Sequence, residues 1–176
     1  MRELMLFRHA KSDWSVEGIP DHQRQLNGRG RMAAPAMAQH IFELGLMPDE
    51  ILCSTAVRTR QTLDLMSAKW QELAPEWPAK IGFEDHLYEA SPMAIMACIG
   101  NVDDRSNRLM VIGHNPGLED LADYLLQGQS SELQSAMSAK FPTAALALLE
   151  ISTNTWASLA GSSVRLTQFI QPADIR

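Results

Sequence analysis

The sequence contains little cysteine, no long apolar run and few positive charges. Cysteine occurs at two of 176 positions, Cys53 and Cys98, which lie far apart and form no Cys-x-x-Cys pair. This usage excludes a small disulfide scaffold and predicts reduced thiols in a cytoplasmic protein. The apolar run before Arg8 has four residues, too short for a signal peptide, and no later run approaches the ~18 residues of a membrane span. We therefore expect no membrane association.

Positive charge is also scarce. Fifteen lysines and arginines are outnumbered by 21 aspartates and glutamates, which gives a net charge of −6. A nucleic-acid surface needs a basic face, so we expect no nucleic acid among the partners. An acidic protein can nevertheless hold a small cationic pocket for a phosphorylated ligand. The hydrophobic share of 45% is ordinary for a globular protein and argues against disorder.

The pattern along the chain is that of an α/β protein. No repeat or linker divides it, and its length suits a single domain, 1–176. Short apolar runs predict strands over 4–7, 51–53, 80–83, 108–112, 144–151 and 164–170. Longer helical stretches separate most of them. This order predicts a three-layer α/β/α sandwich with a mostly parallel central sheet, in which one of the two late strands runs antiparallel.

Capping residues and spacing indicate where the helices lie. Asn27 and Ser91 are expected helix caps, Gly45 is a plausible stop, and Gly117 begins the helix that runs to 126. Apolar positions with helical spacing are expected to face the core in the first helix: Met32, Ala36, Met37, Ile41 and Leu44. The second helix carries a similar apolar set: Leu63, Met66 and Trp70.

Polar residues follow each of the first four predicted strands. They are Arg8 and His9, the segment 54–58, Glu89, and the pair Gly113 and His114. Ligands of open α/β sheets bind beyond the carboxyl ends of the strands, near a switch in strand order. We therefore expect these groups, which are distant along the chain, to meet at one end of the sheet.

His9 has two interpretations. A lone histidine at a strand end is more often structural, bonding a backbone carbonyl, but Arg8 beside it has no obvious packing role. A neutral imidazole is a competent nucleophile toward phosphorus, and neighbouring guanidinium groups should lower its pKa by disfavouring another positive charge. We predict that His9 attacks a phosphoryl group; the sequence does not tell which ring nitrogen does so.

The other candidate residues also have alternatives. Arg58 is either a solvated helix-start residue or a bidentate clamp on phosphate oxygens, while Arg60 would point elsewhere. His114 follows the clearest strand and could donate to a phosphate oxygen. Glu89 is placed to protonate a leaving group and then activate water, although a glutamate just before a helix is favourable on structural grounds alone.

Five segments, in order, resemble the histidine phosphatase superfamily, most closely its SixA-type phosphohistidine phosphatases. They are LFRHAKSDW, D-x-x-R-x-L-N-x-x-G over 21–30, S-x-x-x-R-T-x-Q-T over 54–62, LYEAS, and VIGHNPGLEDL. The resemblance implies a phosphoglycerate mutase-like fold and a phosphatase without metal or other cofactor. It implies His9 as the phosphorylated nucleophile, a phosphate pocket completed by Arg8, Arg58 and His114, and Glu89 at the proton-donor position. We add Ser12 and Asn115 as substrate-binding residues.

The departures from the wider family point to a subgroup. Ala10 stands where the superfamily has glycine, as in SixA-like members, and the short stretch between Glu89 and Arg108 leaves no room for a large cap. The resemblance thus implies an open site that admits a protein-borne phosphohistidine, or a small phosphorylated molecule, and that binds phosphate, sulfate or vanadate. Four basic residues are either its rim or plain solvated surface: Lys11, Arg24, Arg29 and Arg31.

Two rival catalytic chemistries fit the same sequence less well. A cysteine phosphatase needs five residues between its cysteine and arginine, whereas four separate Cys53 from Arg58, without glycines. A zinc hydrolase finds no HExxH or HxH pair, and arginines near His9 would repel a cation. A mutase, a phosphatase of small metabolites and a catalytically silent phosphate-binding module remain open.

Overall fold

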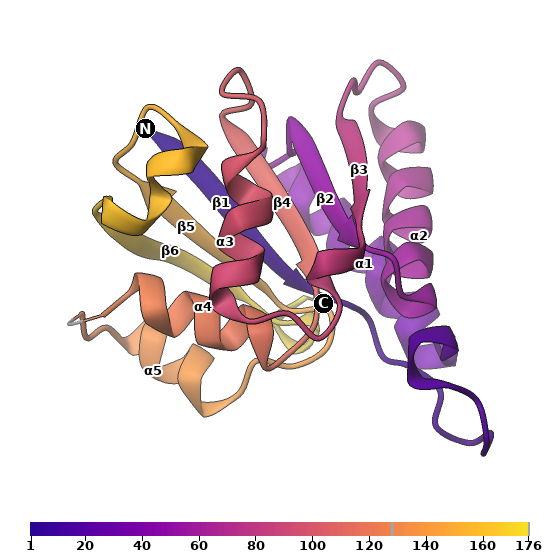
Figure 1. Ribbon diagram of the computed structural model, residues 1–176. Coiled ribbons are helices and arrows are strands. Elements are labelled where there is room, and N and C mark those ends of the chain that lie inside the picture. Colours follow the sequence, from indigo (N-terminus) through magenta and orange to yellow (C-terminus); the bar gives the residue numbers. More distant parts are fainter. Residues whose placement is uncertain (128, 176) are drawn as a thin grey trace.

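The computed structural model describes residues 1–127 and 129–175, whose central element is a six-stranded sheet (Figure 1). Its strands are β1 (Arg2–Arg8), β2 (Glu50–Ser54), β3 (Lys80–Glu84), β4 (Arg108–Gly113), β5 (Leu146–Ile151) and β6 (Val164–Ile170). They lie in the order β3-β2-β4-β1-β5-β6. The pairs β1–β4, β2–β4 and β2–β3 are parallel, whereas β5 runs antiparallel to β1 and β6. The predicted mostly parallel sheet with one antiparallel late strand is confirmed.

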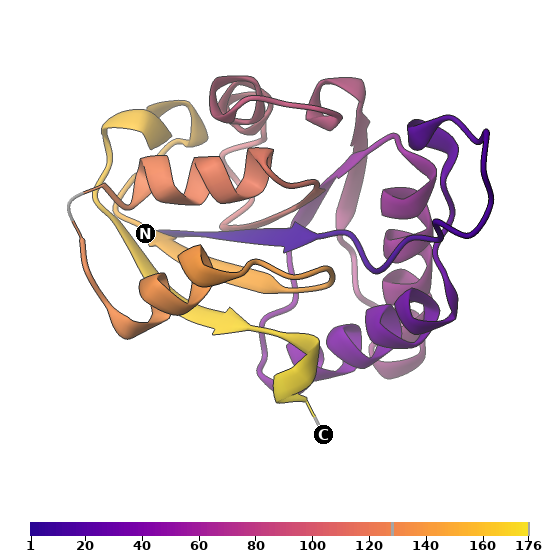
Figure 2. The same ribbon diagram turned by 90° about the horizontal axis from the view of Figure 1, so that it is seen from below.

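Helices cover both faces of this sheet (Figures 1 and 2). One face is covered by α1 (Gly28–Glu43) and α2 (Val57–Leu73), and the other by α3 (Pro92–Gly100), α4 (Gly117–Leu125) and α5 (Glu132–Ala139). Side chains of β1 alternate between the two layers: Met5 and Phe7 pack toward α1 and α2, while Leu4 and Leu6 pack toward α3 and α4. The three-layer α/β/α prediction is therefore confirmed. No helix within the described residues is long and apolar enough to cross a membrane.

Several element boundaries follow local chemistry. Asn27 and Ser91 cap α1 and α3 as predicted, each accepting a backbone N–H through its side chain. Strand β5 begins at Leu146 rather than at the predicted position 144, because Ala144 takes a left-handed φ of 61° that does not fit a strand. Helix α5 was not predicted; it buries Met137 and leaves Leu133 37% exposed, too weak an apolar pattern to recognise.

The predicted apolar face of α1 is partly wrong. Met37 and Ile41 are fully buried, but Met32 is 76% exposed, Leu44 is 43% exposed and Ala36 is also exposed. The buried stripe instead runs through the small residues Gly30, Ala34 and Ala38. Small side chains let α1 approach α2 closely, and the Trp70 indole of α2 donates to the Ala38 carbonyl over 2.8 Å. Close packing thus selected the small face, and Met32 and Ala36 were left on the surface.

Candidate active site

Three parallel strands end at the same edge of the sheet and deliver the candidate residues to one place. Arg8 at the end of β1 pairs in register with Gly113 at the end of β4, and β2 ends beside them at Ser54. A cavity of about 570 Å³ opens at this edge. It is lined by every residue proposed from sequence for the site: Arg8, His9, Ser12, Arg58, Glu89, His114 and Asn115.

The imidazole of His9 is buried, oriented and neutral. Its Nδ1 lies 2.7 Å from the carbonyl oxygen of Ala10. Because a carbonyl oxygen can only accept a hydrogen bond, Nδ1 carries the proton. Burial, followed by the charges of Arg58 and Arg8, lowers the pKa of His9 to about 4, against the opposing hydrogen bond to Ala10. The lone pair of Nε2 is therefore available near neutral pH. The nitrogen that the sequence left undecided is Nε2.

Arg58 is fixed beside that lone pair by Asp21. Its Nε donates to His9 Nε2 over 3.3 Å, Nη1 donates to the Asp21 carbonyl over 2.6 Å, and Nη2 donates to Asp21 Oδ2 over 2.9 Å. The hydroxyl of Tyr88 donates to the same Oδ2 over 2.8 Å. Burial alone would raise the pKa of Asp21, but the hydrogen bonds from Tyr88 and Arg58 outweigh it and lower that pKa. Each terminal guanidinium nitrogen still has a second hydrogen for an anion.

The ring of His114 lies beside the ring of His9, and one of its nitrogens has no hydrogen-bond partner among the described residues. Its ring centroid lies 5.2 Å from that of His9, and its Nε2 lies 2.7 Å from Ser54 Oγ. The Ala56 N–H donates to that hydroxyl at 3.5 Å, which favours donation of the hydroxyl proton to His114. Nδ1 then carries the ring proton, and it is buried without a hydrogen-bond partner among the described residues. Burial, then His9 and Arg58, lower the pKa of His114 to about 3, so the ring is neutral near pH 7.

The side chains of the remaining predicted residues, Glu89, Asn115 and Ser12, differ in the hydrogen bonds that they already make within the protein. Glu89 is exposed, makes no hydrogen bond within the described residues, and takes a left-handed φ of 50°, a strained conformation of the kind that clusters at functional sites. Asn115 uses its amide nitrogen to hold Glu119 and the Phe141 carbonyl, and its Oδ1 is buried without a hydrogen-bond partner among the described residues. Ser12 Oγ accepts from the Trp14 indole over 3.0 Å.

Three residues of the site were not predicted as site residues from the sequence. Asp21 positions Arg58, Tyr88 braces Asp21, and Ser54 contacts His114. Asp21 opens the D-x-x-R segment and Ser54 opens the S-x-x-x-R segment, so the motifs contained them. Their roles could not be predicted from the sequence, because each of these contacts joins residues at least 37 positions apart.

The four predicted rim residues separate into two groups. Lys11 lines the active-site cavity, and Arg29 lines a neighbouring one. Arg24 instead stacks its guanidinium 4.1 Å from the centre of the Trp14 ring, and Arg31 reaches Gln25 at 3.5 Å. Neither Arg24 nor Arg31 lines these cavities, which favours the surface alternative over the rim alternative for these two residues.

The residues of the two alternative catalytic centres, a cysteine phosphatase and a zinc hydrolase, can also be examined in the structure. Cys53 is fully buried in β2, where burial raises the pKa of its thiol to about 12, and it does not line the active-site cavity. It is the small buried strand residue that was predicted. Within 1–127 and 129–175, no three histidine, cysteine, aspartate or glutamate side chains are grouped as metal ligands would be.

Comparisons with solved structures support the fold. A protein designated phosphohistidine phosphatase SixA from Nakamurella multipartitia superposes with a TM-score of 0.83 and 28% identity, covering 97% of this chain and 96% of that one. Its counterpart from Agrobacterium tumefaciens gives 0.78 and 28%, over 97% and 99%. The protein histidine phosphatase SixA complexed with tungstate gives 0.77 over 98% of each chain, at 17% identity, and so supports the fold alone.

Sequence relatives extend over nearly the whole chain. An uncharacterized protein of Mycobacterium tuberculosis (strain H37Rv) is 33% identical over 167 residues, covering 94% of this chain and 99% of its own length. An uncharacterized chloroplastic protein of Arabidopsis thaliana is 32% identical over 162 residues, covering 88% and 69%. The family model that matches residues 4–91, half of the chain, is the histidine phosphatase superfamily, branch 1. With the resemblance seen in its motifs, these matches establish that the chain belongs to the histidine phosphatase superfamily.

Proposed function

We propose that this protein is a metal-independent phosphatase that forms a phosphohistidine at His9 and passes the phosphoryl group to water. The observation that carries the proposal is the state of the His9 ring. Its Nδ1–H is spent on the Ala10 carbonyl, its pKa of about 4 keeps it neutral, and Nε2 lies next to Arg58. A buried, neutral and oriented imidazole beside a fixed guanidinium suits attack on phosphorus.

In the first step, Nε2 of His9 forms a bond to phosphorus while the bond from phosphorus to the leaving group breaks. The guanidinium groups of Arg8 and Arg58 and the Nδ1–H of His114 stabilise the charge on the phosphoryl oxygens, where most of the rate enhancement is expected to arise. Glu89, which is exposed at the cavity, gives its proton to the leaving group.

In the second step, the Glu89 carboxylate takes a proton from water. The oxygen of that water bonds to phosphorus, and the P–N bond to His9 breaks. Inorganic phosphate leaves, and His9 recovers its neutral ring. Each proton and bond is thereby returned to its starting state, and no metal is required.

As substrate class we propose a protein-borne phosphohistidine. Two proteins designated phosphohistidine phosphatase SixA match this fold at 28% identity over nearly the whole chain, and they support this choice. The connection from β3 to α3 is short, and the cavity is correspondingly uncovered by any inserted domain. A small phosphorylated metabolite is the alternative that a substrate comparison has to exclude.

The direct test is to trap the phosphoenzyme. We expect wild-type protein mixed with a ³²P-labelled phosphoryl donor to yield an acid-labile, alkali-stable label at His9 that decays with turnover, and unchanged turnover in chelator. His9→Ala should lose label and turnover while its circular dichroism stays unchanged. His40→Ala, in the last turn of α1 and not among the residues that line the active-site cavity, is the matched control and should keep both. Aryl phosphate hydrolysis retained by His9→Ala would refute the covalent mechanism, and a stable label that never turns over would indicate a binding module instead.

A further inference from the structure

A basic cavity adjoins the active site. Its volume is about 480 Å³, and it shares Arg8, Lys11 and Thr143 with the active-site cavity. Four cationic side chains line it, Arg8, Lys11, Arg29 and Lys140, and no aspartate or glutamate of the described chain does so. In a protein of net charge −6, such a concentration of one sign marks a place for an anionic group.

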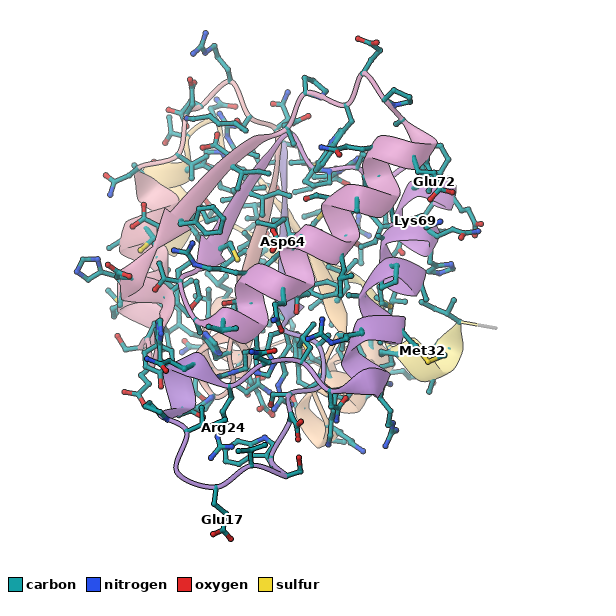
Figure 3. All side chains as sticks on the ribbon, turned by 90° about the vertical axis from the view of Figure 1, so that its right-hand side faces the viewer. Glu17, Arg24, Met32, Asp64, Lys69 and Glu72 are labelled. Carbon is teal, nitrogen blue, oxygen red and sulfur yellow. The ribbon has the colours of Figure 1, made fainter. Side chains whose placement is uncertain are left out.

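A third hollow continues from the basic cavity along the outside of α1. It measures about 330 Å³ and shares Arg29, Ala33 and Pro172 with the basic cavity. Its other lining residues are apolar: Met32, Ala36, Met37 and Ile175. Figure 3 shows Met32 on the outer side of α1, next to the C-terminal segment. We call this hollow the Met32 groove.

The Met32 groove accounts for the α1 residues that the core did not use. Met32 is 76% exposed and Ala36 is exposed, although both belong to the apolar pattern that the sequence displays. An apolar face that the protein's own core leaves open is suited to a partner. Because this face is continuous with the basic cavity, and through it with His9, the partner it fits is the substrate.

We infer that the basic cavity and the Met32 groove together dock the protein that carries the phosphohistidine, which deepens the substrate class proposed above and rests on it. Carboxylate side chains near the phosphohistidine pair with Arg29, Lys11 and Lys140, and an apolar side chain farther away packs on Met32. A small metabolite would fill the two charged cavities and leave the Met32 groove without a function. A protein surface covers all three hollows.

The size of the effect follows from exposure. Arg29, Lys140 and Lys11 are all exposed, so each ion pair contributes only a few-fold to binding and is weakened by salt. Docking should therefore act on KM rather than kcat, and only for substrates that reach beyond the active-site cavity.

The test uses histidine-phosphorylated peptides as probes. One series carries glutamates on both sides of the phosphohistidine, a second has glutamine at those positions, and a third adds leucines outside the glutamates. p-Nitrophenyl phosphate, which occupies the active-site cavity alone, reports basal activity. The variants are R29Q/K140Q and M32Q; the matched controls are R31Q, outside these cavities, and M93Q, 63% exposed on α3 over the opposite face of the sheet.

For wild type we expect kcat/KM to be roughly 5- to 20-fold higher for the glutamate series than for the glutamine series at low salt, and this ratio to collapse near 0.5 M salt. R29Q/K140Q should remove the ratio by raising KM, and M32Q should remove the gain from leucine. Both variants should hydrolyse p-nitrophenyl phosphate as fast as wild type does. The controls R31Q and M93Q should turn over every probe as wild type does.

Equal turnover of the three peptide series by wild type would overturn the inference. A loss of activity in R29Q/K140Q that is seen with a small bisphosphate but not with the peptides would overturn it as well. Wild-type hydrolysis of p-nitrophenyl phosphate without any peptide turnover would overturn it too, while leaving the covalent mechanism intact. Absence of both activities and of label at His9 would instead reject the proposed function itself.

Discussion

Nε of Arg58 donates a hydrogen bond to Nε2 of His9 over 3.3 Å. The guanidinium that can bind a phosphoryl oxygen therefore also holds the lone pair that would attack phosphorus. Attack requires this bond to be exchanged for one from Arg58 to a phosphate oxygen. Asp21 holds Nη1 and Nη2 of Arg58, so the guanidinium stays in place while its Nε changes partner.

Arg58→Ala is expected to lower kcat by roughly 10²–10³-fold, the usual cost of removing a preorganised donor from a developing charge. Competitive inhibition by tungstate or vanadate should weaken in parallel, because the planar clamp on the anion is lost. Arg60→Ala is the matched control, since Arg60 lies on the same helix but stacks over Phe83, 4.5 Å from its ring centre. Steady-state kinetics with an aryl phosphate provides the measurement, and inhibition that is equal in Arg58→Ala and wild type would remove Arg58 from the anion site.

The His9 ring should remain neutral far below the ordinary histidine pKa. ¹⁵N NMR of the imidazole is expected to show a proton on Nδ1 and no titration of His9 between pH 8 and 5, in line with its pKa of about 4. Arg58→Ala should raise this pKa by removing a nearby charge, yet keep it below 6.5 because burial, the largest cause, persists. Arg60→Ala should not move it. A His9 midpoint near 6.5 in the wild type would contradict the proposed neutral nucleophile.

Protein stability should fall as the solution is acidified from pH 6.5. An unfolded imidazole titrates near 6.5, whereas the pKa of His9 is about 4 and that of His114 is about 3 in the fold. Between these values the unfolded chain binds more protons, so the stabilising contribution is complete above pH 6.5 and is lost toward pH 4 and 3. Urea denaturation should show a slope of up to about 1.4 kcal/mol per pH unit for each ring. His9→Gln should have a shallower slope than wild type over pH 6.5 to 4.5; an identical slope would argue against a buried neutral His9.

Ser54→Ala tests whether Ser54 positions the ring of His114. Loss of the 2.7 Å hydrogen bond should free the ring to adopt either tautomer and lower kcat by roughly 5- to 10-fold, in keeping with ~1–1.5 kcal/mol for one net hydrogen bond. The ¹⁵N pattern of His114 should change from a single Nδ1–H form to a mixture, which a loss of packing alone would not produce. Ser67→Ala, a half-buried serine on α2 outside the site, is the control and should alter neither reading.

Gly30 is required by the close approach of α1 to the loop that follows β1. A Cβ built there would lie 2.2 Å from the Lys11 carbonyl oxygen and 2.9 Å from its nitrogen, so backbone would have to move. Gly30→Ala is expected to destabilise the protein by about 1–3 kcal/mol, the range of overpacked sites, and to impair turnover by displacing the loop next to His9. Gly28→Ala, whose Cβ meets nothing within 4 Å, should be neutral or stabilising by about 0.5 kcal/mol. Thermal denaturation of the two variants distinguishes these outcomes.

Much of the fold could be read from local pattern. The six strands, the caps Asn27 and Ser91, and the antiparallel late strand were predicted because apolar runs, capping side chains and turn residues are local signals. The carboxyl ends of parallel strands converge, so the sequence also predicted that Arg8, Arg58 and His114 would share one cavity. Where the local signal was weak, as in α5, the prediction failed.

By itself, then, the sequence determined the six strands and most of the helices along the chain, the residues at the sheet edge, and the resemblance to a family. Only the tertiary structure decided that Nδ1 of His9 bonds Ala10, that Asp21 fixes Arg58, and that Ser54 orients His114. It also decided that α1 packs its small face inward and leaves Met32 outside. The physical reason is the same in each case: hydrogen bonds and close packing between residues far apart in the chain depend on three-dimensional distances, and these leave no period or spacing in the sequence.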